Sequence, residues 1–263
     1  MTTTRETVTS DIYDYPQYYD LVYGSDWKAE FDFLLECFER YAIGKVQNLF
    51  EPACGTGRLL IKLAQEGFMV AGNDLNEKSI RYCNQRLERH GFPPSAVVGD
   101  MSDFVLDEKV DAAFNMINSF RHLMSEELAE NQLRCVAQSL RPGGLYVLGF
   151  FLTLTEGEMQ ERESWSARRG HLAVTSHLWT IQRDLQQRIE RVGMAYDVYT
   201  PTRQFRLESE IDFRTYTAKQ FLALVDRIPK LEIAAVHDFA YDVEQDIELT
   251  PQTEDVVFVL RKC

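Results

Sequence analysis

A glycine-bearing turn carries the residues of this chain whose types and spacing could do chemistry. Residues 48–60 join a short apolar strand to a helix through this turn, in which Gly55 and Gly57 can adopt backbone angles closed to other residues. A ligand could therefore approach the main chain, and the following helix points free backbone N–H groups at its anionic end. Glu51 adds a negative charge at the strand's end, where a cationic group is favoured. The turn predicts a site for a nucleoside-like ligand.

A carboxylate follows at the spacing expected for a ribose contact. Asp74 ends a second predicted strand about twenty residues past Gly55, where a carboxylate can accept hydrogen bonds from both hydroxyls of an adenosine ribose. The alternative role for Asp74 is a helix cap or a turn acid before Asn76. The glycine turn favours the ribose contact. Dinucleotide-dependent enzymes share this arrangement, but Leu60 stands where they use a third glycine.

The turn resembles the first motif of the class I S-adenosylmethionine-dependent methyltransferases. That motif reads acid-x-x-x-Gly-x-Gly, which Glu51, Gly55 and Gly57 match, while Ala53 stands where another glycine is common. The resemblance implies S-adenosyl-L-methionine as the cofactor and S-adenosyl-L-homocysteine as its product. It also implies a cofactor-binding set that comprises Tyr19, Tyr23, Glu51, Ala53, Gly55, Gly57, Arg58, Asp74, Leu75, Asp100, Met101, Asn115 and Met116.

Two later strand ends extend the resemblance. In this family an acid at the position of Asp100 receives the adenine amino group, and the next residue, here Met101, lies along the ring. The alternative is that Asp100 is a turn acid. The fourth predicted strand runs into Asn115 and Met116, at the carboxyl edge of the sheet where α/β proteins bind ligands. We expect this segment to border the methyl group.

Residues 118–123, together with the Arg-Pro-Gly-Gly run at 141–144, resemble small-molecule N-methyltransferases, especially those that dimethylate nucleotide-linked amino sugars. In that subgroup a histidine stands at the position of His122, near the amine, which implies that His122 is the catalytic residue. An aromatic N-terminal segment covers the cofactor there, which implies lid contacts from Tyr19 and Tyr23. The Asn/Asp-Pro-Pro-Tyr/Phe signature of DNA and glutamine amino-methyltransferases is not found in the sequence.

Structural alternatives stand beside these roles. A lone histidine is more often structural than catalytic, and the tyrosines could pack the first helix onto the sheet. Arg214 resembles the arginine of an Arg-x-Tyr-Ser/Thr element of the same subgroup. Its side chain could bind a substrate anion or form a structural ion pair.

Strands alternate with helices along most of the chain, which predicts a parallel sheet. Hydrophobic periodicity places strands at 46–50, 68–72, 95–98, 110–117 and 145–152, and helices at 26–41, 59–66, 77–90 and 126–140. A polar and apolar alternation predicts antiparallel strands within residues 153–213, before a helix at 217–226 and closing strands at 231–237 and 256–260. We expect a Rossmann-like seven-stranded methyltransferase sheet with helices on both faces and an inserted antiparallel β subdomain.

This order predicts a single methyltransferase domain over residues 1–263 with four parts. They are an N-terminal lid and helix at 1–41, a cofactor-binding core at 42–152, the inserted subdomain over the active site at 153–213, and the completion of the core sheet at 214–263. We expect the inserted strands to shape the acceptor pocket, because the fold itself does not choose the acceptor.

The composition of the chain indicates which partners, metals and cellular location to expect. The 263 residues are 45% hydrophobic, and 41 acidic against 28 basic side chains give a net charge of -13, which disfavours a nucleic-acid partner. The five cysteines form no Cys-x-x-Cys pair and no metal-ligand spacing, so we expect reduced thiols and no metal. The polar N-terminal residues and the lack of a long apolar run predict a cytoplasmic protein without a membrane partner.

The leading hypothesis is a methyltransferase that uses S-adenosylmethionine on a small-molecule acceptor, at nitrogen rather than oxygen or carbon, by direct in-line transfer. The alternatives are an NAD(P)-dependent oxidoreductase on a related fold and a catalytically silent S-adenosylmethionine-binding protein. Metal-dependent O-methylation is disfavoured because Asn115 and Asn118 replace a carboxylate cluster. The acceptor's identity, the number of methyl groups transferred, the exact role of His122 and a possible homodimer all stay open.

Overall fold

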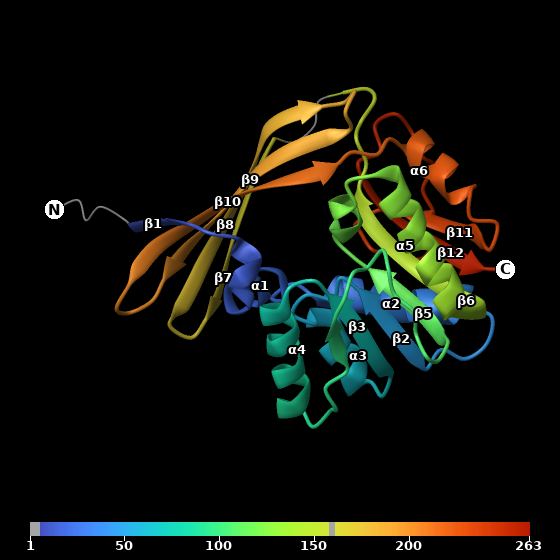
Figure 1. Cartoon of the computed structure of the whole chain (residues 1–263), viewed down its shortest axis with the longest axis horizontal. Helices are drawn as coiled ribbons and strands as arrows, with labels where there is room; N and C mark the ends of the chain where they lie inside the picture. The colour runs from blue at the N-terminus through green and yellow to red at the C-terminus, as the bar shows by residue number, and fades with distance from the viewer. Residues whose placement is uncertain (1–5, 158–160) are drawn as a thin grey trace.

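A computed structural model describes residues 6–157 and 161–263, which form two sheets (Figure 1). The larger sheet has seven strands in the order β11-β12-β6-β5-β2-β3-β4. Its strands are β2 (Asn48–Pro52), β3 (Met69–Asp74), β4 (Ala96–Val98), β5 (Val110–Asn115), β6 (Leu140–Phe151), β11 (Leu231–His237) and β12 (Asp255–Lys262). Strands β2 to β6 pair in parallel, and β12 is antiparallel to both of its neighbours, β6 and β11. The expected α/β fold with a seven-stranded methyltransferase sheet is confirmed.

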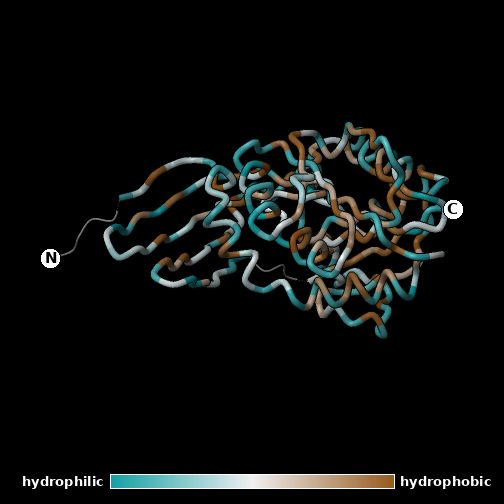
Figure 2. The backbone as a smooth tube through the Cα atoms, turned by 90° about the horizontal axis from the view of Figure 1, so that it is seen from below, coloured by the Kyte–Doolittle hydropathy of each residue, from teal (hydrophilic) through white to brown (hydrophobic). Residues whose placement is uncertain are grey.

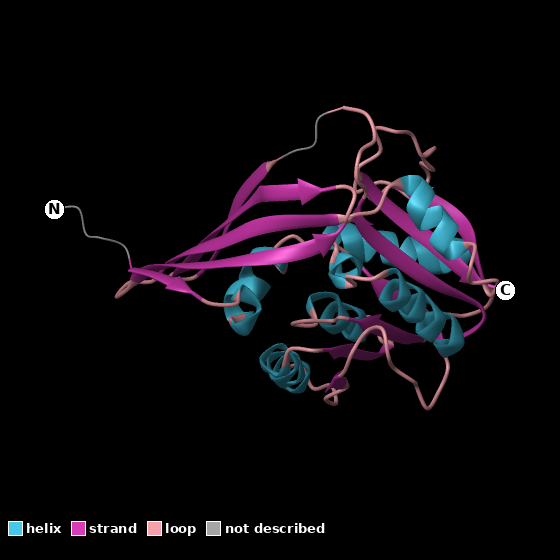
Figure 3. Cartoon of the chain, turned by 45° about the horizontal axis from the view of Figure 1, so that its top comes forward, coloured by secondary structure: helices cyan, strands magenta, loops and turns pink. Residues whose placement is uncertain are grey.

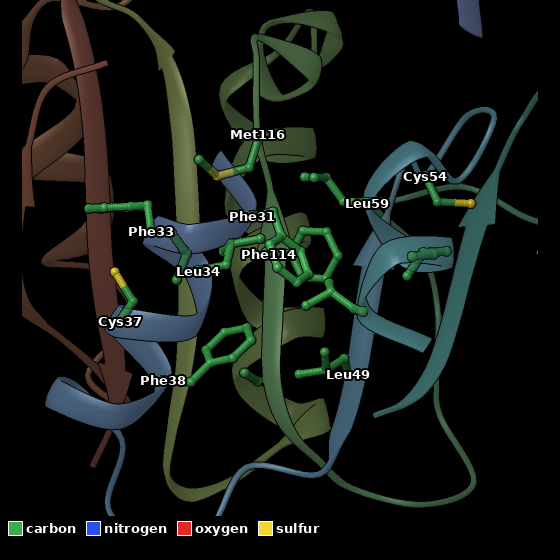
Figure 4. Close-up of a cluster of buried hydrophobic side chains, with 14 of the residues drawn as sticks. Phe31, Phe33, Leu34, Cys37, Phe38, Leu49, Cys54, Leu59, Phe114 and Met116 are labelled. Atoms are coloured by element: carbon green, nitrogen blue, oxygen red, sulfur yellow. The ribbon is translucent and has the colours of Figure 1, made fainter. Parts of the chain in front are cut away.

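Helices cover both faces of this core sheet. Helices α2 (Lys28–Tyr41), α3 (Arg58–Gln65) and α4 (Glu77–Arg89) share one hydrophobic cluster with the strands. Figure 4 shows part of that cluster, in which Phe31 and Leu34 of α2 lie near Phe114 of β5. Helices α5 (Glu126–Ser139) and α6 (Ala218–Val225) share a second cluster on the opposite face. Burial on both faces explains why the central strands are apolar along most of their length.

Helix ends follow local capping chemistry. The Asn76 side chain accepts a hydrogen bond from the Ser79 N–H at the start of α4, and Ser125 does the same for Leu128 in α5. A full capping box begins α6, where Thr217 caps the helix and Gln220 reaches back to the Thr217 N–H. The cap of α4 is therefore Asn76 and not Asp74.

The second sheet has five strands in the order β1-β10-β9-β8-β7. Strands β7 (Arg162–Arg169), β8 (Leu172–Asp184), β9 (Ile189–Tyr199) and β10 (Gln204–Arg214) are antiparallel, in agreement with the alternation in the sequence. The fifth strand, β1 (Glu6–Thr9), pairs in parallel with β10 and was not expected from the sequence. Figures 1 and 3 show these strands reaching outward from the core toward the N-terminal end.

One face of the second sheet packs on the N-terminal helices. Leu21 and Val22 of α1 (Pro16–Tyr23), and Ile12 of the short helix η1 (Ile12–Asp14), form a third hydrophobic cluster with Val174 and Val198 of the sheet. Polar and apolar residues alternate along these strands, as the colouring in Figure 2 shows. This packing places η1 and α1 between the second sheet and helix α4.

Strand β6 is longer than the sequence predicted. It begins at Leu140, whereas the Arg-Pro-Gly-Gly run suggested a strand that starts only at Leu145. Leu140 pairs with Val110, and the register then shifts before Leu145 pairs with Ala112. The run is thus an irregularity inside the strand, which the left-handed Gly143 (φ 77°) helps to form.

Candidate active site

A cavity of about 650 Å³ lies between the carboxyl edge of the core sheet and the second sheet, within the size range of small-molecule sites. Most of its lining comes from three parts of the chain, namely the N-terminal segment, the loops after the parallel strands, and the inner face of strands β7 to β10. Eight of the predicted site residues lie in its wall, namely Tyr19, Tyr23, Ala53, Gly55, Asp74, Leu75, Met101 and His122. The other six, Glu51, Gly57, Arg58, Asp100, Asn115 and Met116, do not line it.

The glycine turn is held in left-handed backbone geometry. Ala53, Gly55 and Gly57 have φ angles of 54°, 52° and 66°. A Cβ atom at Gly55 would meet only the Asp74 Oδ2 atom, at 4.0 Å, so a ligand can approach the main chain there. At Gly57 a Cβ atom would lie 2.3 Å from the Cys83 sulfur of α4. Gly55 therefore gives access to the main chain, whereas Gly57 permits the turn to pack on α4.

Asp74 joins the glycine turn to the end of β3. Its Oδ2 atom accepts a hydrogen bond from the Gly55 N–H at 2.9 Å, and its Oδ1 atom accepts one from Asn76 at 2.8 Å. Burial raises the pKa of this carboxyl, although the two backbone hydrogen bonds oppose the change. Each carboxylate oxygen can accept more than one hydrogen bond, and Asp74 also lines the cavity. The turn role and a ligand role are thus compatible.

Glu51 and Arg58 are not among the residues that line the cavity. Arg58 forms two hydrogen bonds to Glu30, Nη1 to Oε1 at 2.8 Å and Nη2 to Oε2 at 2.5 Å, so its charge is already paired. Glu51 is 6% exposed, and its Oε2 atom has no hydrogen-bond partner among the described residues. Burial raises the pKa of Glu51, with Arg58 opposing the change. An unpartnered buried carboxylate oxygen is a strong acceptor for a donor brought by a ligand.

The three other predicted residues outside the wall make contacts within the protein. The Oδ1 atom of Asp100 accepts hydrogen bonds from the N–H and the hydroxyl of Ser102, at 2.7 and 2.8 Å. Asn115 donates to the Pro52 carbonyl at 2.6 Å, and Met116 packs in the core. Asp100 thus has the contacts of a turn acid, while its neighbours Gly99 and Met101 reach the cavity.

His122 also lines the cavity, at the end of the short helix η2 (Ser119–His122). Its Nε2 atom is 3.1 Å from the Tyr13 hydroxyl, and its ring centroid is 4.8 Å from that of Phe213. Burial, helped by the charge of Arg121, lowers the pKa of His122 to about 4. The imidazole is therefore neutral at neutral pH.

Tyr13 is a site residue that the sequence reasoning missed. It lies two residues before the aromatic run at 15–23 that indicated a lid, and this proximity was the only local signal. Its ring centroid is 5.6 Å from that of Tyr19, which in turn lies 4.5 Å from Tyr23. Burial raises the pKa of Tyr13 and raises that of Tyr19 to about 12. The three rings form one aromatic wall of the cavity.

Ion pairs attach the second sheet to the core. Arg121 donates to Glu190 Oε2 at 2.6 Å, and Arg183 donates to Glu190 Oε1 at 2.5 Å. Arg214 bonds to Glu126 at 3.0 Å and does not line the cavity. The structural alternative for Arg214 therefore agrees with its contacts.

The fold identifies the structural class of this protein. A seven-stranded sheet with β12 antiparallel beside β6, and a cavity at its carboxyl edge, is the Rossmann-like fold of S-adenosylmethionine-dependent methyltransferases. Residues 50–144 match the family described as "Methyltransferase domain". The family resemblance drawn from the glycine turn is confirmed.

Curated relatives match part of the chain. It is 31% identical over 140 residues to dTDP-3-amino-3,4,6-trideoxy-alpha-D-glucopyranose N,N-dimethyltransferase of Streptomyces venezuelae, covering 51% of this chain and 56% of that protein. It is 32% identical over 114 residues to glycine N-methyltransferase of Rattus norvegicus, covering 38% and 39%. The chain thus spans about half the length or less of these curated relatives.

Solved structures share the fold over nearly the whole chain. DesVI of Streptomyces venezuelae superposes with a TM-score of 0.77 at 20% identity, covering 95% of this chain and 98% of that one. An S-adenosylmethionine-dependent methyltransferase from Clostridium acetobutylicum gives 0.76 at 17% identity, covering 96% and 99%. A third neighbour, at 0.69 and 19% identity over 92% of this chain and 97% of its own, is a SAM-bound amino pentose methyltransferase from Micromonospora echinaspora. Among the described residues, no helix is long and apolar enough to cross a membrane.

Proposed function

We propose that this protein is an S-adenosylmethionine-dependent methyltransferase that acts on the amine of a small-molecule acceptor. One observation supports this most strongly. The glycine turn with Asp74 and the Tyr13–His122 pair both line a single cavity at the carboxyl edge of a methyltransferase sheet. Cofactor and acceptor could therefore meet inside it.

The residues present fit the cofactor. Asp74 would hold the ribose, Gly55 would let the ligand approach the main chain, and Tyr19 would cover it from the N-terminal side. The unpartnered Oε2 atom of Glu51 would accept a hydrogen bond from a cationic amino group behind the turn. When bound, the cofactor supplies a methyl group on a sulfonium centre, which an amine can displace directly once the two are aligned. The cofactor roles of all the predicted site residues, including Arg58, Asp100, Asn115 and Met116, remain predictions.

His122 would position the amine and not remove its proton. A group with a pKa of about 4 is a weak base near neutral pH, so it cannot deprotonate an ammonium efficiently. A neutral imidazole can instead hydrogen-bond the free amine and direct its lone pair toward the methyl group. The Tyr13 hydroxyl, 3.1 Å from Nε2, would fix the tautomer and the ring orientation.

We assign the acceptor to a chemical class, the amines. One relative is named for N,N-dimethylation of a dTDP-linked amino sugar and another for N-methylation of glycine. Both names specify nitrogen, which supports an amine acceptor here. The residues over the acceptor side come from the second sheet, so we propose that this sheet selects the substrate.

Calorimetric titration with S-adenosylmethionine, S-adenosylhomocysteine and NADH tests the cofactor. We expect the first two to bind and NADH not to bind. Release of S-adenosylhomocysteine across a panel of amines and alcohols would then test transfer and the preference for nitrogen. Binding of NADH alone would instead support an oxidoreductase, and cofactor binding without any transfer would support a silent binding protein.

A further inference from the structure

The lining of the cavity as a whole contains more acidic than basic side chains. Among the described residues, six carboxylates line the cavity, namely Asp11, Asp74, Glu161, Glu163, Glu190 and Glu254, against the three arginines Arg121, Arg162 and Arg183. His122 adds no charge near neutral pH, because burial lowers its pKa to about 4. A cavity lined mainly by one sign of charge attracts ligands of the opposite sign.

Two of the three arginines, Arg121 and Arg183, are already paired with a carboxylate. Arg121 and Arg183 both bind the carboxylate of Glu190, which is 4% exposed, and Arg121 also donates to the Arg214 carbonyl. Glu254 interacts electrostatically with Arg183 and with Glu190, so a second carboxylate balances the second arginine. These two arginines and two glutamates together therefore carry little net positive charge that could bind a diphosphate.

The Glu163 carboxylate is not paired with a described arginine in this way. It is the second residue of β7, it is partly buried, and the structure shows no hydrogen bond or ion pair of its side chain with a described residue. Burial raises its pKa, and the neighbouring Asp255 carboxylate raises it further. The same two causes raise the pKa of Glu254, on which Asp255 and Glu163 both act. These carboxylates repel one another, so a cation placed among them would be stabilised.

Aromatic rings lie beside Glu163. Trp165, two residues further along β7, points to the same face of the sheet and also lines the cavity. Its ring centroid is 5.4 Å from that of Tyr23, and its indole N–H donates to the Val22 carbonyl at 3.4 Å. A carboxylate beside fixed aromatic rings is a typical environment for binding an ammonium group.

The acidic surface continues past Glu254. A neighbouring cavity of about 400 Å³ shares this residue and is lined by three further carboxylates, Asp238, Glu248 and Asp255, with no lysine or arginine among its described lining residues. A flexible cationic ligand could extend in this direction. A nucleoside diphosphate would meet repulsion there.

We propose that the acceptor carries a second, positively charged group in addition to the reacting amine, and that Glu163 with Trp165 and Tyr23 binds this group. The proposal rests on the proposed methyltransferase function and narrows its substrate class to diamines and similar cationic amines. It separates this protein from relatives named for dTDP-linked sugars. The reacting amine would be neutral beside His122, while the second group would keep its charge at Glu163.

Binding measurements test the proposal. Putrescine serves as the diamine probe, and thymidine diphosphate serves as the anionic probe. Each is titrated calorimetrically into the whole protein, with and without S-adenosylhomocysteine. We expect putrescine to bind more tightly than thymidine diphosphate, and Glu163→Gln to weaken putrescine binding roughly tenfold, because one charge-assisted contact is lost. Glu210→Gln, which removes an exposed carboxylate from β10 outside the cavity, should leave putrescine binding unchanged.

Tighter binding of thymidine diphosphate, or equal putrescine affinity in the two variants, would overturn the proposal. Methyl transfer tests the underlying function separately. We expect a lower KM for putrescine than for butylamine, and Glu163→Gln should remove this difference while leaving affinity for S-adenosylhomocysteine unchanged. If Glu163-dependent putrescine binding were found without any methyl transfer, the cation site would stand and the methyltransferase function would fail.

Discussion

The two walls of the cavity are held in place by different interactions. On the core side, the backbone fixes the geometry, since the Gly55 N–H and the Asn76 N–H both bind the carboxylate of Asp74. On the side of the second sheet, charged side chains do so, with Arg121 and Arg183 converging on Glu190. The first arrangement depends on a few residues close together in the chain. The second depends on residues that only the folded chain brings together.

This difference suggests that the two walls serve different ligands. A wall built on backbone hydrogen bonds keeps its shape when side chains change, which suits a cofactor shared by many enzymes. A wall attached through ion pairs can change its lining residues without disturbing the core sheet, which suits a variable acceptor. If so, mutations in one wall should leave the function of the other largely intact.

The largest expected effect comes from breaking the ion pairs of the second sheet. Glu190→Ala leaves Arg121, which is 5% exposed, without its carboxylate. An uncompensated buried charge typically lowers the free energy of unfolding by about 3–5 kcal/mol. Urea denaturation would measure the loss. Glu232→Ala, which breaks the more exposed pair with Arg261, is the control and should cost about 1 kcal/mol or less.

The core wall is tested by cofactor affinity. Asp74→Ala removes two hydrogen bonds to a bound ribose and also releases the Gly55 N–H, so binding of S-adenosylhomocysteine should weaken by about 3 kcal/mol. Calorimetric titration measures this. At a temperature where Glu190→Ala is still folded, that variant should bind S-adenosylhomocysteine almost normally. Similar losses in both variants would show that the two walls are not independent.

The core wall could be predicted because its parts are local. Gly55, Asp74 and the strand ends follow one another in a βα order that a single pass along the chain detects. Even there, Asp100 and Arg58 lie outside the cavity wall, and each binds a protein partner, Ser102 and Glu30 respectively. No periodicity in the sequence encodes such pairings.

The other side could be predicted only as antiparallel strands. The pairing of β1 with β10 joins Glu6 to Phe205, and β1 is too short and polar to be recognised alone. The Tyr13–His122 contact joins residues 109 positions apart, and the Arg121–Glu190 pair joins residues 69 apart. Long-range contacts of this kind depend on how the sheets pack, which the order of elements does not specify.

His122 lies between the two walls and should make the protein sensitive to acid. Its pKa is about 4 in the folded state, below the usual 6.5, so the unfolded state binds a proton more readily. The stability linked to the neutral ring is therefore fully present above pH 6.5 and is lost as the pH falls from 6.5 through 4. The loss should approach about 3 kcal/mol. Urea denaturation at several pH values, compared with His122→Asn, would measure it, and an identical pH profile for the two proteins would contradict the assignment.

The smallest expected effect comes from Tyr13→Phe, which tests whether Tyr13 positions His122 or only packs beside it. Tyr13→Phe keeps the ring against Tyr19 but removes the hydroxyl that meets His122 Nε2. Losing one neutral hydrogen bond costs about 1 kcal/mol, so kcat for an amine acceptor should fall roughly fivefold while affinity for S-adenosylhomocysteine stays the same. Steady-state kinetics beside calorimetry would resolve the two. Equal losses would place Tyr13 with the core wall and its cofactor, whereas a change confined to kcat would place it, with His122, on the acceptor side.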